Sequence, residues 1–219
     1  MTMILCIETS TTNCSVAIAK EGKVLAMLED NEIKYSHAER LHHYIEQVLE
    51  EAKIKITNLK AIAISKGPGS YTGLRIGVSA AKGLCYALDI PLISIPTLQI
   101  LALQADTKSD FIIPMLDARR MEVYSCVFNN KREQIREIKA EILAENSFME
   151  YLNKGQVTFI GNANKKFKEV CSHKNAIYLD QKLPSSKEMC LLAASKYKKN
   201  DTEIVAYFEP YYLKDFIGG

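Results

Sequence analysis

Short apolar runs alternate with longer amphipathic segments, and this pattern predicts an α/β protein. Apolar runs at 3–8, 14–19 and 24–28 indicate three strands, with Lys20-Glu21-Gly22-Lys23 as the turn between the last two. Apolar positions within 36–52 recur at helical spacing, and Ser36-His37-Ala38-Glu39 has a capping-box pattern. A strand at 61–65, a helix at 74–88, a strand at 92–95 and a helix at 97–104 follow. The first half therefore reads β-β-β-α-β-α-β-α.

The second half repeats this order loosely. Strands are predicted at 111–115, 123–128, 133–143 and 157–161, with helices from 147 and at 164–171. A last helix begins at Ser185-Ser186-Lys187-Glu188, a second capping-box pattern. We therefore expect an internal duplication, with one half at 1–106 and a degenerate second half at 107–219. The last helix, 186–199, is a candidate to pack back on the first half.

Composition is that of an ordinary globular protein and excludes disordered and fibrous classes. Of 219 residues, 47% are hydrophobic and 25% charged, and the net charge of +2 gives no footprint of a dedicated nucleic-acid binder. The six cysteines contain no C-x-x-C pair, which favours buried thiols in a reducing compartment. Without a signal-peptide pattern or a bilayer-length apolar run, we expect a cytoplasmic protein with no membrane partner.

A glycine-rich loop at 66–77 separates a predicted strand from a predicted helix. Pro68 and Gly69 favour a sharp turn, and Ser70 or Thr72 can cap the helix. Such a loop can bind an anion, yet neither Gly-Lys-Ser/Thr nor Gly-x-Gly-x-x-Gly is present. The hydroxyl-rich turn after Glu8 can likewise wrap a phosphate or simply bond to its own backbone. Candidate phosphate-loop residues are Glu8, Thr9, Ser10, Gly67, Gly69, Ser70 and Thr72.

Signals for catalysis and metal binding are weak. His37, His42 and His43 do not converge on one helix face, and no nucleophile-elbow motif occurs. We therefore expect no catalytic residue and no metal ligand. The segment Asp117-Ala118-Arg119-Arg120-Met121-Glu122-Val123-Tyr124 packs four charges into a turn between strands. It is either a salt-bridged exposed hairpin or a contact for a substrate or partner.

The helix after the glycine loop is apolar on nearly all sides. Gly73, Gly77 and Ala81 recur every four residues, a stripe that permits close approach of another backbone. A helix of this kind must be covered on most faces. We expect the helix that starts at Ser36 to cover one side, and a second subunit to complete the cover.

Five segments together resemble the bacterial TsaB (YeaZ) family over nearly the whole chain. They are Ile7-Glu8-Thr9-Ser10, residues 36–41, residues 66–77, residues 117–124 and Pro210-Tyr211-Tyr212-Leu213. The resemblance implies an actin-like/sugar-kinase (ASKHA) fold of two ribonuclease-H-like halves. It also implies a role in making N6-threonylcarbamoyladenosine at position 37 of tRNA.

Within that family the catalytic relative is TsaD, which carries a His-x-x-x-His metal pair. Laid on that pattern, this chain has Thr97 and Leu101, neither of which can replace an imidazole. Its Gly161-Asn162-Ala163-Asn164 also lacks the paired glycines of the TsaD adenine-nucleotide motif. The resemblance therefore implies a partner subunit without catalytic activity of its own.

The implied partners are a TsaD-like catalytic subunit, a TsaE-like ATPase and, in isolation, a second copy, with tRNA reached indirectly or through the complex. No cofactor is expected on this chain alone, whereas ATP and a divalent metal are expected in the partner subunits. The expected interface residues are Arg40, Leu41, Tyr44, Ile45, Val48, Gly73, Arg75, Gly77, Val78 and Ala81.

Two other functions remain open. A small ATPase or phosphotransferase of the same fold would use the Glu8 turn and the glycine loop for phosphate, although an acidic general base and adenosine-binding glycines are not evident. A metallopeptidase would need metal ligands that the sequence does not offer.

Overall fold

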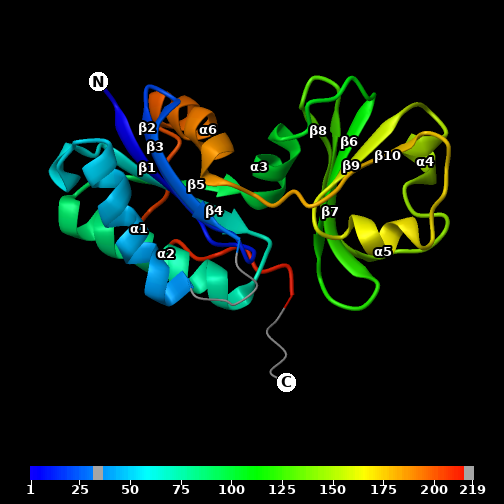
Figure 1. Ribbon diagram of the computed structural model, residues 1–219, viewed down its shortest axis with the longest axis horizontal. Helices are drawn as coiled ribbons and strands as arrows, with labels where there is room; N and C mark the ends of the chain where they lie inside the picture. Colours follow the sequence, from blue (N-terminus) through cyan, green and yellow to red (C-terminus); the bar gives the residue numbers. More distant parts are fainter. Residues whose placement is uncertain (32–36, 215–219) are drawn as a thin grey trace. The chain divides into compact units, whose positions relative to one another are not determined.

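The computed structural model describes residues 1–31 and 37–214, which form two compact units (Figure 1). The first unit comprises Met1–Thr97 and Pro184–Gly219, and the second comprises Leu98–Leu183. The sequence placed the end of the first half at residue 106, whereas the chain leaves the first unit after Thr97. The capping box predicted at Ser36 lies outside the described residues.

The first unit is built on a five-stranded mixed sheet in the order β3-β2-β1-β4-β5. Its strands are β1 (Met3–Glu8), β2 (Cys14–Lys20), β3 (Lys23–Asp30), β4 (Ala61–Gly67) and β5 (Leu92–Pro96). Strands β1, β2 and β3 are antiparallel neighbours, whereas β1, β4 and β5 are parallel. The parallel pairs require crossovers, which helices and a short 3-10 turn (Ile56–Asn58) supply.

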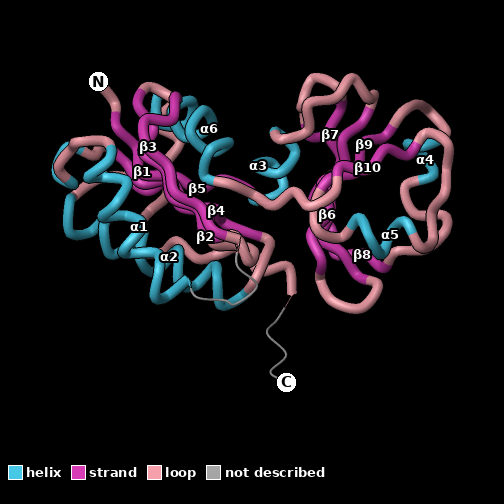
Figure 2. Tube along the Cα trace, in the orientation of Figure 1, coloured by secondary structure: helices cyan, strands magenta, loops and turns pink. Residues whose placement is uncertain are grey.

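Three helices cover this sheet. Helices α1 (His37–Glu51) and α2 (Tyr71–Leu88) lie side by side on one face, and α6 (Ser186–Lys198) lies on the other (Figure 2). The Ser70 hydroxyl caps α2 by accepting a bond from the Gly73 amide, and Ser185 caps α6 in the same way through Lys187. The capping residues predicted for these two helices are therefore confirmed.

The second unit repeats the same topology with shorter helices. Its sheet has the order β10-β9-β6-β7-β8, formed by β6 (Phe111–Asp117), β7 (Glu122–Asn129), β8 (Gln134–Ile142), β9 (Val157–Ile160) and β10 (Ala176–Leu179). Its helices are α3 (Thr97–Leu103), α4 (Met149–Leu152) and α5 (Asn164–Lys168). Strand directions match those of the first sheet pair by pair. The predicted duplication and the actin-like fold class, with two ribonuclease-H-like halves, are confirmed, although β10 was missed.

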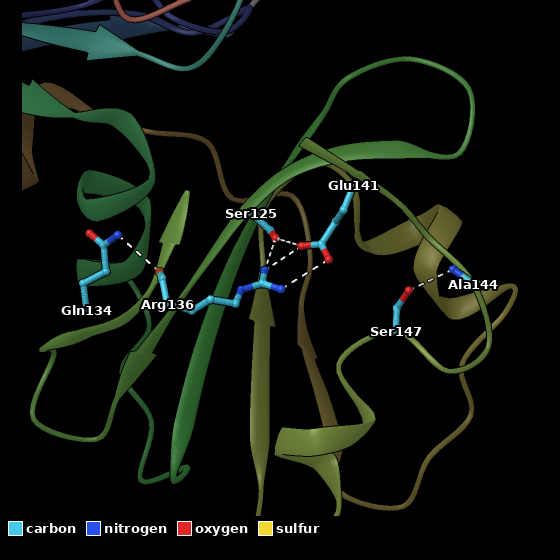
Figure 3. A network of polar contacts seen from close by, with 6 residues as sticks. All are labelled: Ser125, Gln134, Arg136, Glu141, Ala144 and Ser147. Atoms are coloured by element: carbon cyan, nitrogen blue, oxygen red, sulfur yellow. Dashed lines mark hydrogen bonds and ion pairs between the residues drawn. The ribbon is translucent and has the colours of Figure 1, made fainter. Parts of the chain in front are cut away.

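A partly buried polar cluster joins the edge strand β8 to β7. The Arg136 guanidinium binds both Glu141 carboxylate oxygens, at 2.5 and 3.2 Å, and the Ser125 hydroxyl at 2.5 Å (Figure 3). The same guanidinium lies 5.0 Å above the Phe148 ring. Arg136 and Glu141 both belong to β8, so the bonds of both side chains to Ser125 on β7 are the ones that join the edge strand to its neighbour.

All six cysteines are buried and unbonded, as the sequence predicted. Burial raises the pKa of Cys85 to about 12, so its thiol stays protonated at neutral pH. Over the described residues, no helix combines the length and the apolar character needed to cross a membrane.

Candidate functional site

The two candidate phosphate-binding segments meet where β1 and β4 end. These strands are parallel neighbours, so the turn after Glu8 and the loop after Lys66 emerge at the same edge of the sheet. The Ser70 amide donates to the Ser10 carbonyl over 2.6 Å, and the Thr9 hydroxyl donates to the Gly73 carbonyl over 2.8 Å. The structure thus joins the predicted residues into one site.

Glycine is required in this loop because two backbones touch there. A Cβ on Gly69 would lie 2.3 Å from the Ser10 carbonyl oxygen, and one on Gly73 would lie 2.1 Å from that of Thr9. Neither space would accommodate alanine without moving the backbone. The glycines therefore allow the loop and the Glu8 turn to pack against each other.

Several amide groups of the two segments are already used inside the chain. The Gly67 amide donates to the Thr97 hydroxyl at 3.2 Å, and the Gly73 amide donates to the Ser70 hydroxyl at 3.3 Å. The Ser10 amide donates to Glu8 at 2.6 Å. A phosphate-binding loop needs amide groups that can donate hydrogen bonds to the ligand. In this conformation these three amides donate to the chain's own side chains instead.

Glu8 is the most unusual residue of the site. It is fully buried, and while one carboxylate oxygen accepts the Ser10 amide, the other has no hydrogen-bond partner among the described residues. The hydroxyls of Ser10 and Ser65 are buried and unpartnered in the same sense. Burial raises the pKa of Glu8 to about 7, opposed only in part by the neighbouring polar groups. The carboxyl is therefore close to half protonated at neutral pH.

His37 connects α1 to the same turn. Its ring is buried, and Nε2 lies 2.7 Å from the Thr11 carbonyl oxygen, to which it donates. Burial lowers the pKa of His37, which favours the neutral ring. His42 and His43 are exposed, and the described residues contain no group of three His, Cys, Asp or Glu side chains that would hold a metal ion. Sequence spacing gave no signal for the contact between His37 and Thr11.

The small-residue stripe faces the chain's own Glu8 turn instead of a partner. A Cβ on Gly77 would lie 2.2 Å from the Thr9 hydroxyl and 3.0 Å from the Ile64 side chain. The stripe does allow the predicted close approach, but the backbone that it approaches belongs to the first sheet and its Glu8 turn. The interface itself stays a prediction, and seven of its predicted residues are buried within the unit: Leu41, Ile45, Val48, Gly73, Gly77, Val78 and Ala81.

Three of the predicted interface residues remain accessible. Arg40 forms an ion pair with Asp30, and the Tyr44 hydroxyl donates to the same carboxylate at 3.2 Å. Arg75 lies on the exposed face of α2, with its guanidinium 4.0 Å above the Tyr71 ring and its Nε 3.3 Å from the Tyr212 hydroxyl. The same helix presents Tyr86, which is 88% exposed.

The two positions that the resemblance assigns to the TsaD metal histidines, Thr97 and Leu101, lie on α3, and both are buried. Thr97 accepts the Gly67 amide, and Leu101 belongs to an apolar cluster of the second unit. Each side chain therefore has a structural role that an imidazole ligand would disrupt.

The Asp117 segment forms a second carboxylate turn, at the end of β6. Asp117 accepts the Arg119 amide at 2.6 Å and pairs with Lys166 at 3.2 Å, and its own amide donates to the Asn162 side chain at 2.8 Å. In the duplicated topology this position corresponds to Glu8 at the end of β1.

Comparison with known proteins places these features in a family. The family model described as TsaD, tRNA N6-adenosine threonylcarbamoyltransferase, matches residues 30–217. The chain belongs to the TsaD family. It is 29% identical to the tRNA threonylcarbamoyladenosine biosynthesis protein TsaB of Escherichia coli, over 97% of this chain and 94% of that protein.

The structural comparison agrees. YeaZ from Pseudomonas aeruginosa superimposes with a TM-score of 0.84 at 26% identity, covering 97% of this chain and 100% of YeaZ. The tRNA N6-adenosine threonylcarbamoyltransferase of Bacillus thuringiensis is 35% identical over 109 residues, but these are only 43% of this chain and 32% of that enzyme. The resemblance to TsaB (YeaZ) is thus confirmed along the whole chain, whereas the likeness to the transferase is partial.

Proposed function

We propose that this chain is a noncatalytic partner subunit in tRNA N6-threonylcarbamoyladenosine formation, and that it binds and stabilises a TsaD-type catalytic subunit. The carrying observation is the replacement of the catalytic histidine pair by buried Thr97 and Leu101, in a chain that matches TsaB along its length. In this proposal ATP and the divalent metal belong to the partner subunits, which include a TsaE-type ATPase.

The geometry of the Glu8 site supports this function over an ATPase. Amides of the glycine loop donate within the chain, and the buried Glu8 carboxyl is half neutral near pH 7. A general base or a magnesium ligand is most effective as an accessible carboxylate. The site instead acts as the anchor that positions α1 and α2.

The partner surface is the outward face of α2. Arg75, Ser79 and Tyr86 are exposed along it, and a cavity of 920 Å³ lies at its C-terminal end, lined by residues that include Tyr86, Ile90 and Val205. An exposed tyrosine beside an apolar cavity is the kind of anchor that carries binding energy in protein interfaces. A second copy of the chain would use this same face when the catalytic subunit is absent.

Reconstitution tests the proposal. Purified TsaD-type subunit, TsaE-type ATPase and unmodified tRNA should form the modified nucleoside efficiently only when this chain is present. Tyr86→Arg should weaken binding of the catalytic subunit about tenfold or more, because the complex would lose an aromatic side chain that the partner buries. Ile142→Arg, on the exposed edge strand β8 of the second unit, is the matched control and should leave binding unchanged. Equal rates with and without this chain would refute the proposed function.

A further inference from the structure

The turn between β6 and β7 has an unusual backbone. Arg119 and Arg120 are both exposed and have φ values of 73° and 49°, in the left-handed region that side chains other than glycine rarely adopt. Within residues 1–31 and 37–214, no other two consecutive non-glycine residues share this conformation. In the β2–β3 turn of the first unit, the two consecutive residues with positive φ are Glu21 and Gly22, so one of them is glycine. Residues in strained backbone conformations persist where the surrounding structure holds them in place, and they are found most often at functional sites.

The backbone of this turn is braced from several directions. Asp117 accepts the Arg119 amide, and the Lys166 ammonium donates to the carbonyl oxygens of Arg120 and Glu122 at 2.9 and 2.6 Å. Lys166 also pairs with Asp117, so the charge of this carboxylate already has a cationic partner. These contacts hold the turn in place through its main chain.

The two guanidinium groups, by contrast, have no hydrogen-bond or ion-pair partner among the residues that the structure describes. The adjacent helix α5 adds the exposed Lys165. Two positively charged forks are therefore presented to solvent on a rigid turn. Guanidinium groups bind phosphate oxygens through paired hydrogen bonds, and pre-organisation lowers the entropic cost of doing so.

We propose that Arg119 and Arg120 contact backbone phosphates of the tRNA that the complex modifies. This inference rests on the proposed function, which supplies a polyanionic substrate. A protein partner is less well matched, because the turn lacks an exposed apolar anchor: Met121 is half-buried, and its carbonyl accepts the Leu143 amide. With a net charge of only +2, the chain would add a local contact to RNA binding by the complex.

The test removes the two charges and keeps the turn. The double variant Arg119→Asn, Arg120→Gly places residues that favour positive φ at both positions. Its matched control is Lys20→Gln, Lys23→Gln, which removes two charges beside the β2–β3 turn. Binding of an unmodified tRNA transcript is measured for the full chain alone and in complex with the TsaD-type subunit, from 50 to 200 mM salt.

The turn variant should bind the transcript about tenfold more weakly, and the slope of log affinity against log salt should fall by about 1.5 to 2. The lysine control should match the unsubstituted chain. Arg119→Lys, Arg120→Lys should keep most of the salt dependence, since both charges remain.

The inference is overturned if the turn variant and the lysine control have the same affinity and salt slope in both preparations. It is also overturned if millimolar ATP displaces the transcript from this turn. The same holds if the turn variant binds the transcript normally and loses only its binding to the TsaD-type subunit. A pull-down of the TsaD-type subunit by the unsubstituted chain tests the proposed function separately, and the tRNA measurement on the chain alone still decides this inference if that pull-down fails.

Discussion

Glu8 and Asp117 occupy equivalent places in the two units but have opposite environments. Each accepts, over 2.6 Å, the amide of the residue two positions on. Glu8 is fully buried without a cationic partner, whereas Asp117 is exposed and paired with Lys166. The end of the duplicated strand thus carries an acid in both units, and burial raises the pKa of the one in the first unit, Glu8.

The raised pKa of Glu8 predicts how stability depends on pH. Its folded-state value of about 7 lies above the reference of 4.5, so between these pH values the folded state holds a proton that the unfolded state has released. Stability should therefore fall as pH rises from 4.5 to 7 and stay level above it. The difference corresponds to about 3 kcal/mol at most.

Glu8→Gln should abolish this pH dependence. The amide oxygen of glutamine can still accept the Ser10 amide, and the neutral side chain removes the cost of burying a charge. Urea unfolding at pH 8 should show a free energy of unfolding higher by about 1–3 kcal/mol than that of the unsubstituted chain. At pH 5 the two proteins should be nearly equal. An equal difference at both pH values would show that the carboxyl does not titrate in this range.

At the scale of elements, α2 offers two glycines with opposite surroundings. A Cβ on Gly77 would lie 2.2 Å from the Thr9 hydroxyl, whereas one on Gly83 would meet nothing within 4 Å. Gly77→Ala should therefore destabilise the fold by about 1–3 kcal/mol through overpacking. Gly83→Ala should stabilise it by up to about 1 kcal/mol, because alanine favours the helix. Thermal unfolding of both variants checks the sign, and a loss of stability in both would contradict this account.

The elements of this fold could be read from the sequence where local signals are strong. Alternating apolar runs located β1 to β9, and Ser70 and Ser185 marked two helix starts. Strand β10 was missed because Ala176–Leu179 is short and only partly buried, which leaves no clear alternation. The stripe on α2 predicted close packing, but the sequence could not tell that Thr9 fills it, since that contact joins residues far apart in the chain.

The sequence indicated which residues make up the candidate site but not the contacts between them. Glycines, hydroxyls and an acid near strand ends indicated residues that the structure brings together, because parallel strands bring their carboxyl ends to the same edge of the sheet. The internal use of their amides, and the contact of His37 with Thr11, depend on three-dimensional packing that no spacing rule encodes. A phosphate loop and a packing loop therefore look alike in sequence.

At the scale of the whole molecule, the chain enters the second unit once and returns to the first for its last helix. Helix α6 packs on β1 and β2 through residues that include Met189 and Ala193. Its start is held by hydrogen bonds, with the Ser186 amide donating to the Ser15 hydroxyl at 3.0 Å and the Ser185 hydroxyl donating to Glu29 at 2.7 Å. The first sheet therefore depends on a helix that follows the whole second unit in the sequence.

Truncation after Leu183 should therefore destabilise the first unit selectively. Loss of α6 would expose the face of β1 and β2 that it covers, while the second unit keeps all of its own strands. Hydrogen exchange followed by mass spectrometry should show protection lost in β1 to β5 and retained in β6 to β10. Ser186→Ala, which removes one buried hydroxyl from this junction, should lower the free energy of unfolding by only about 1 kcal/mol and keep protection in both sheets. Equal loss of protection in the two sheets of the truncated chain would show that the second unit also depends on α6, and that the two units fold as one.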